Sequence, residues 1–372
     1  MSSGKIARSM LYTVEDRRRI VGLDSLRFVC ALWVALHHGA RPEISTWLGL
    51  SDVAIAWNAI AFDGVAAVIV FFVISGLCVH YPYAGSERCY LPTYFARRFI
   101  RIGIPLIAIL AFMEFSRPIV GNDVASAPKF ILWSLWCELI YYLIYPILLL
   151  CFKKIGMVKV ILLSFIAAYA VIISHWELLV YWEYSWKLAW ITALPAWLLG
   201  CAIAQILAAG SLPLLPGSIW WWRLAAVFLS IPPKALVYAS ISPILIGNPA
   251  TLGAFSIFVF FWVMKEIDNF GRHPPRIFVE WCGSWSYSLY LTHIIVIYAC
   301  NEAFVHLNHF ERWPLRMIAI LTASYAFYCI FERPARVIAR FAALRLRQPE
   351  LAERIKSSFL GSLVIRLNCT PF

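Results

Sequence analysis

Long, unbroken apolar stretches dominate the hydrophobic pattern of this chain. Ten of them follow one another with short polar connections, at 24–40, 58–80, 99–115, 130–152, 157–175, 186–208, 219–239, 249–268, 284–304 and 314–335. A transmembrane helix needs about 20 predominantly apolar residues. The pattern therefore predicts an all-α, polytopic transmembrane helix bundle of about ten spans. The seventh stretch is the least regular, because Pro232, Pro233 and Lys234 interrupt it.

Composition strengthens this prediction. Apolar residues make up 62% of the chain and charged residues 14%, whereas soluble domains hold about 45–50% and about 25%. This argues against a cytosolic enzyme, a secreted disulfide scaffold or a disordered protein. Most of the 10 cysteines lie inside the apolar stretches without paired spacing. We therefore expect small apolar side chains there, with no disulfides and no metal site.

The basic residues are distributed as membrane topology predicts. Outside the apolar stretches, 22 Lys and Arg lie in one set of alternate loops and tails, and 5 lie in the other set. The positive-inside rule then places both termini in the cytoplasm. The net charge of +12 thus indicates a lipid bilayer as partner and no nucleic acid.

Three regions follow from this topology. We expect a cytoplasmic N-terminal tail at 1–22, a transmembrane domain at 23–336, and a cytoplasmic basic amphipathic tail at 337–372. The last tail is suited to lie on an anionic inner leaflet, or it is a plain soluble tail.

Polar residues inside the first stretch form a pattern. Arg27 and His38 are eleven residues apart, which returns a helix to within about 20° of the same face, some ~16 Å further along its axis. Asp24 lies on the same side, and His37 lies about 80° away. Ionisable groups within a span mark functional sites by default. The alternative is that Arg27 reaches the lipid headgroups and that His38 makes a structural hydrogen bond.

The fourth stretch carries Glu138, with Ser134 and Tyr142 on the same face at i−4 and i+4. A carboxylate inside a membrane must be paired or protonated. Its predicted depth matches that of His38, which makes His38 a candidate partner. A structural ion pair with some other cation is the alternative.

Arg98 and Arg101 enter the third stretch at i, i+3 and therefore face one side. Two guanidinium groups on one face suit phosphate binding. The alternative is that they only obey the positive-inside rule.

Four weaker features complete the set. His293 is expected to make a structural hydrogen bond, and Gly76 to allow a close helix approach. Asp63 is interpreted as a solvated helix cap. Glu332, followed by Arg333 and a proline, is interpreted as a helix stop with a local ion pair.

Six blocks in this order resemble the acyltransferase-3 family of integral membrane acyltransferases, over residues 22 to 336: LDSLRFVCALWVALHH, FFVISGL, YFARRFIRIGIP, LWSLWCELIYYLIYP, SYSLYLTH and FERPA. The resemblance implies about ten transmembrane helices. It also implies transfer of an acyl group, most often acetyl from acetyl-CoA, to a hydroxyl of a sugar in a cell-surface or exported glycan, so that the expected partners are acyl-CoA and a glycan or glycolipid acceptor. The implied location is a bacterial inner membrane, as a multi-pass protein.

The resemblance also implies roles for residues of this chain. His38 and Glu138 are the expected catalytic pair, and Arg27, Arg98 and Arg101 the expected binding residues for acyl-CoA. Substrate contacts are expected from Trp133, Ser134, Tyr142 and His293. The chain departs from the family pattern in two ways: Pro105 comes one residue later than usual, and the histidine of the first stretch is a doublet.

These expectations combine into one mechanism. Acyl-CoA enters from the cytoplasm, its phosphates lie near Arg98 and Arg101, and its thioester lies beside His38 in one shared tunnel. His38, oriented by Glu138, then acts as a general base on the acceptor hydroxyl or accepts the acyl group transiently. The alternative function is a proton-coupled secondary transporter or exporter that uses the same Arg, His and Glu residues, although such proteins usually show internal repeats, which we do not find here.

Overall fold

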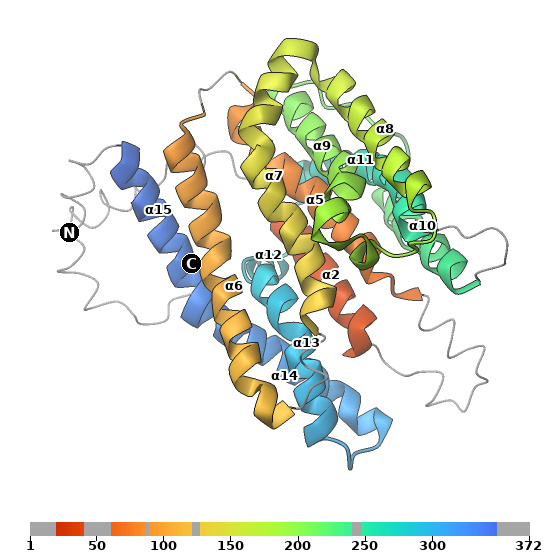
Figure 1. Cartoon of the computed structure of the whole chain (residues 1–372), viewed down its shortest axis with the longest axis vertical. Helices are drawn as coiled ribbons and strands as arrows, with labels where there is room; N and C mark the ends of the chain where they lie inside the picture. The colour runs from red at the N-terminus through yellow and green to blue at the C-terminus, as the bar shows by residue number, and fades with distance from the viewer. Residues whose placement is uncertain (1–19, 41–60, 86–88, 121–126, 240–246, 348–372) are drawn as a thin grey trace.

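Helices account for all regular secondary structure in the part of the chain that the computed structural model describes, which is residues 20–40, 61–85, 89–120, 127–239 and 247–347 (Figure 1). The long helices in chain order are α2 (Leu23–Ala35), α5 (Gly64–His80), α6 (Leu91–Val120), α7 (Ala127–Ile155), α8 (Met157–Ser174), α9 (Ser185–Ala208), α10 (Ile219–Ala239), α11 (Asn248–Arg272), α13 (Ser286–Ala303), α14 (His309–Phe327) and α15 (Arg333–Arg347). Shorter elements are η2 (Leu36–Ala40), η3 (Tyr81–Tyr83), η5 (Tyr181–Tyr184), α12 (Ile277–Gly283) and η6 (Tyr328–Glu332). The all-α prediction is confirmed.

Each of the ten predicted stretches contains a helix, but only part of the span count is confirmed. Six helical segments of the described chain are long and apolar enough to cross a membrane: Gly64–Tyr83, Leu132–Ile155, Met157–Ser174, Tyr181–Ala208, Asn248–Arg272 and Phe310–Arg347. The helices of the other four stretches, α2, α6, α10 and α13, are not among these six. The count of ten spans and the cytoplasmic location of both termini stay predictions.

Helix α2 is fixed at both of its ends. At its start, the carboxylate of Glu280 in α12 accepts hydrogen bonds from the backbone N–H of Gly22 (3.2 Å) and Ser25 (3.1 Å) and from the Ser25 hydroxyl (2.7 Å). A carboxylate at this position satisfies free N–H groups and the helix dipole. At its end the helix widens into the π-helical turn η2, where Gly39 has φ 116°. The guanidinium group of Arg316 donates to the Gly39 carbonyl.

Helices α5 and α9 pack closely in the centre of the bundle. A Cβ on Gly76 would lie 1.8 Å from the Trp197 carbonyl oxygen, and one on Gly200 would lie 2.0 Å from the Val73 carbonyl oxygen. The two backbones therefore approach as only glycine permits. The indole N–H of Trp197 donates to the Ser75 hydroxyl across the same contact (3.2 Å). The predicted close approach at Gly76 is confirmed.

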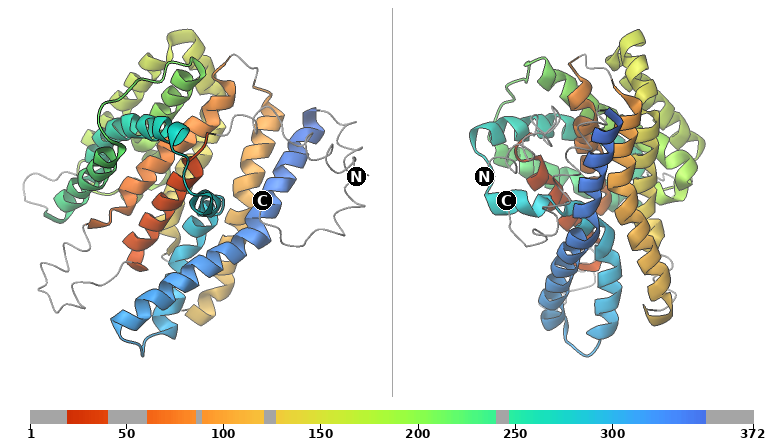
Figure 2. Two further views of the ribbon diagram at one scale, coloured as in Figure 1. Left: turned by 180° about the vertical axis from the view of Figure 1, so that it is seen from behind. Right: turned by 90° about the vertical axis from the view of Figure 1, so that its left-hand side faces the viewer.

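The C-terminal helices correct one prediction. Instead of stopping at Glu332, the chain continues through η6 into α15, which lies beside α6 (Figures 1 and 2). The Glu332 carboxylate accepts from the backbone and hydroxyl of Ser288 and pairs with Arg336, one turn further on. These contacts satisfy the buried carboxylate, so the helix can continue. Residues 337–347 belong to α15, and the remainder of the predicted amphipathic tail lies outside the described residues.

The α5–α9 contact makes a stability prediction. Gly76→Ala forces the two backbones apart and should lower the free energy of unfolding by about 1–3 kcal/mol. This appears as a lower apparent melting temperature of the purified protein in detergent. Gly103→Ala in α6 is the matched control, since no atom lies within 4 Å of its added methyl group. Equal melting temperatures for the two variants would contradict the packing described here.

Candidate active site

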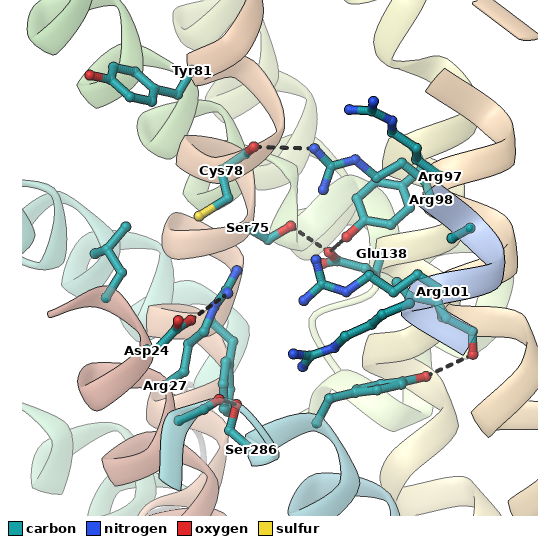
Figure 3. A pocket seen from close by; sticks show the side chains of 18 of the residues that line it. Asp24, Arg27, Ser75, Cys78, Tyr81, Arg97, Arg98, Arg101, Glu138 and Ser286 are labelled. Carbon is teal, nitrogen blue, oxygen red and sulfur yellow. Dashed lines mark hydrogen bonds and ion pairs between the residues drawn. The ribbon is translucent and has the colours of Figure 1, made fainter. Parts of the chain in front are cut away.

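A cavity of about 570 Å³ lies between α2, α5, α6, α7, α13 and α15 (Figure 3). Its lining holds six arginines: Arg27, Arg97, Arg98, Arg101, Arg336 and Arg340. Asp24 and Glu138 are the two carboxylates in the lining. The cavity is therefore strongly basic, although it lies within a bundle of largely apolar helices.

The structure holds several of these guanidinium groups in place. Arg27 forms an ion pair with Asp24 one turn earlier in α2 (3.2 Å). Arg98 donates to the Cys78 carbonyl oxygen (3.2 Å), and its guanidinium carbon lies 5.6 Å from the centre of the Tyr142 ring. Fixed cations that outnumber carboxylates form a site for an anion with several negative charges, and the guanidinium group matches phosphate geometry.

Glu138 faces this basic cavity. Its carboxylate accepts hydrogen bonds from the hydroxyls of Ser75 and Tyr142 (Figure 3). Arg27 and Arg98 are near enough to interact with it electrostatically. The carboxylate is thus held by α5 and by its own helix. The partner predicted for Glu138 was His38, and the hydrogen bonds recorded for the two side chains go elsewhere.

His38 instead pairs with His293. Its Nδ1 lies 3.0 Å from the Val34 carbonyl oxygen and 3.3 Å from Nε2 of His293. Nδ1 of His293 lies 3.2 Å from the Leu289 carbonyl oxygen, so this nitrogen carries the proton and donates it to the carbonyl. The Nδ1–H of His38 is then donated to the nearer Val34 carbonyl oxygen and shared with His293 Nε2, by assignment from these partners. In this tautomer Nε2 is the basic nitrogen of His38.

The cavity lining does not reach this imidazole pair. Phe71 and Tyr290 line the cavity, and their ring centres are 6.0 Å apart. The Tyr290 ring lies 5.9 Å from that of His293, and its hydroxyl hydrogen-bonds to the Ser134 hydroxyl (2.6 Å). Because neither His38 nor His293 lines the cavity, the expected continuous tunnel from the arginines to His38 stays a prediction.

The cavity brings together six predicted site residues: Arg27, Arg98, Arg101, Ser134, Glu138 and Tyr142. The other three, His38, His293 and Trp133, are not among its lining residues. His293 contacts His38, and Trp133 stacks on Tyr181 in the core (ring centres 5.0 Å apart). Because Trp133 is buried and does not line the cavity, no contact in the structure supports its predicted role in substrate binding.

Sequence reasoning assigned no site role to Ser75, Arg97, Arg336 and Arg340, which also line the cavity. Ser75 is a polar residue within an apolar run, and this was the signal available for it. Arg97 was counted only as a loop charge. Arg336 and Arg340 follow Glu332 by one and two helical turns, so a helix that continued past Glu332 would have brought them to attention.

Comparison with known families identifies most of this chain. A family model for acyltransferase-3, described as an acyltransferase domain, matches residues 20–333. The predicted resemblance is confirmed over nearly the whole described region. No curated protein and no solved structure matches the chain.

The basic cavity predicts polyanion binding. Inorganic tripolyphosphate should raise the apparent melting temperature of the purified protein, because a ligand that binds only the folded state stabilises it. Replacing Arg98 and Arg101 together by Gln should remove most of this rise. Arg272→Gln is the control, since Arg272 is 60% exposed and pairs with Asp268 outside the cavity. If the double variant keeps the rise in melting temperature and added salt removes it, tripolyphosphate binds unspecifically at the surface. That result would contradict the prediction.

Proposed function

This chain belongs to the acyltransferase-3 family, and we propose that it transfers an acyl group from acyl-CoA to a sugar hydroxyl of a cell-surface or exported glycan. The acyl group that we propose first is acetyl. As a family member it is an acyltransferase that moves groups other than aminoacyl groups, and a multi-pass membrane protein. The observation that carries the choice of donor is the cavity with six arginines. We propose a bacterial inner membrane as its location.

The donor fits the cavity by charge and by length. Coenzyme A carries phosphates at one end and a thiol at the other, joined by an extended arm of roughly 15–20 Å. Arg98 and Arg101 face the cavity from adjacent turns of α6 and bind the phosphates. Ideal helix geometry puts about 16 Å between Arg27 in α2 and His38 in η2, so an arm that starts at the arginines ends near the imidazole pair.

The transfer step uses His38 as general base. Its Nε2 takes the proton of the acceptor hydroxyl while the hydroxyl oxygen attacks the thioester carbonyl. The carbon–sulfur bond breaks, the new ester forms, and the imidazolium returns the proton to the leaving thiolate. The Val34 carbonyl oxygen and His293 Nε2 together accept the Nδ1–H of His38, which keeps Nε2 basic. In this proposal His293, and not Glu138, is the third residue, which orients the base as in a catalytic triad.

Glu138 has a different role in this proposal. With Ser75 and Tyr142 bound to it, the carboxylate fixes the Tyr142 ring against Arg98 and thereby positions the phosphate site. Tyr290 and Phe71 act as a barrier that rotates aside when the arm of the donor enters. This keeps water from the thioester until the acceptor is present.

The test compares two neighbouring histidines. His38→Ala should reduce acyl transfer by the purified protein by about 100-fold or more, the usual loss for a general base. His37→Ala should cost much less, because Nδ1 of His37 lies 2.8 Å from the Phe62 carbonyl oxygen and not beside His293. The reverse order of losses would exclude His38 as the base.

The same assay separates this function from transport. Activity is measured in detergent solution, where no closed compartment exists, as acyl transfer and as release of free coenzyme A. An acyltransferase works under these conditions, whereas a transporter needs a sealed vesicle. Protein that is folded, binds coenzyme A and transfers nothing to an extract of surface glycans would contradict the proposal.

A further inference from the structure

A second, apolar groove runs along the other side of α2. It has a volume of about 360 Å³ and lies between α2, α5, α10 and α11. Its walls include Leu26, Cys30, Trp33, Ala67, Ala226 and Phe255. None of the six arginines of the first cavity lines it. The two spaces are therefore chemically distinct, and α2 contributes to both.

The sequence of α2 explains how one helix serves two sites. Leu26, Cys30 and Trp33 follow the spacing of one helical face and line the groove. Arg27 lines the basic cavity from the neighbouring face. Eleven residues further on, these two faces lead to His37 and His38 respectively. Neither histidine lines the cavity or the groove. His37 contacts the carbonyl oxygen of Phe62, next to Asp63 of the groove, and its ring centre lies 4.7 Å from that of His38.

The polar groups at the two ends of the groove differ in how completely they are hydrogen-bonded. At one end, Arg223 and Glu266 form a two-fold ion pair (2.7 and 2.9 Å), and Trp262 also donates to Glu266. At the other end Asp63, only 2% exposed, caps α5 through Oδ1. Its second oxygen, Oδ2, is buried and has no hydrogen-bond partner among the described residues. Such an atom costs free energy unless a bound donor satisfies it.

Asp63 also lies close to the histidine doublet of the proposed reaction. The carbonyl oxygen of the preceding residue, Phe62, lies 2.8 Å from His37 Nδ1 and accepts from Lys234 Nζ (3.1 Å). The Phe62 ring packs on Trp33, with ring centres 4.9 Å apart. The prediction of a solvated cap at Asp63 is wrong in one respect: it is a cap, but a buried one.

The open side of the groove faces away from the bundle. Val29 of α2 and Val227 of α10 line the groove and are 50% and 40% exposed. In a membrane protein such apolar side chains face hydrocarbon. A molecule that enters here comes from the bilayer, and its apolar part replaces lipid chains at little cost.

We propose that this groove binds the hydrocarbon chain of a lipid that carries a hydroxyl group, namely the lipid anchor of the acyl acceptor, with that hydroxyl donated to Asp63 Oδ2. This inference rests on the proposed function, since it names the acceptor as lipid-linked. Donor and acceptor then approach the histidine doublet from two different faces of α2. The acceptor never needs to cross the basic cavity.

The test measures lipid binding directly. The probe is dodecanol with a photoreactive diazirine on its chain, and the matched probe is the same chain without the hydroxyl. In wild-type protein, light should crosslink the alcohol to peptides of α2 and α10, in preference to the alkane. Asp63→Leu should reduce labelling by the alcohol about ten-fold, the value of a hydrogen bond to a carboxylate, and leave labelling by the alkane.

Two further variants separate binding from folding. Ala226→Phe fills the groove and should abolish labelling by both probes, while Leu229→Phe, which is 45% exposed on the same helix and outside the lining, should label as wild type. Both should keep the rise in melting temperature caused by coenzyme A. Labelling that Ala226→Phe does not reduce, or equal labelling by alcohol and alkane in wild type, would overturn the inference.

A last measurement tests the acceptor role itself. Acyl transfer to a lipid-linked acceptor extract should fall at least ten-fold in Ala226→Phe, with coenzyme A binding unchanged. Full transfer in this variant would refute the acceptor role. If the wild-type protein is labelled by the probe but transfers no acyl group, the proposed function itself is refuted.

Discussion

The structure depends on how guanidinium groups are held inside a helix bundle. Removing a charge from water is costly unless partners replace the water. The six arginines of the cavity have two carboxylates in the lining, Asp24 and Glu138. Glu332, outside the lining, pairs with Arg336, and a backbone carbonyl and a tyrosine ring lie beside Arg98. These partners fix the cations without neutralising the cavity. The remaining positive charge favours a ligand with several phosphates and explains why polar residues gather here at all.

Contacts within one helix were predictable from the sequence. The i, i+3 spacing of Arg98 and Arg101 and the i, i+4 spacing of Glu138 and Tyr142 follow from helix geometry alone, and the structure bears out both. The helical stretches were predictable for the same reason, because a long apolar run in a membrane protein has few alternatives.

Contacts between helices were not predictable in the same way. Ser75 approaches Glu138, and His293 approaches His38, only through the packing of segments more than 60 residues apart. Depth in the membrane suggested Glu138 as the partner of His38, but depth does not fix the rotation of a helix. Packing also places Trp133 in the core. The chain continues past Glu332 into α15, which carries two of the cavity arginines. The sequence did not predict this, because Glu332 followed by Arg333 and a proline resembles a helix stop.

Helix α2 links the two halves of the proposed reaction. Glu280 caps its start and Arg316 holds the π-helical turn at its end, so the histidine doublet is carried by a helix fixed at both ends. Turns of this kind are frequent at functional sites. Rigid support matters because transfer requires reacting atoms about 3–3.5 Å apart.

The most direct test of the central claim is a structure with a bound thioether analogue of acetyl-CoA. We predict phosphates among Arg97, Arg98 and Arg101, Tyr290 turned from its present position, and the thioether within about 4 Å of His38, the separation that a reactive complex requires. Phosphates bound outside the basic cavity would contradict this account. So would a thioether that stays on the arginine side of an unmoved Tyr290.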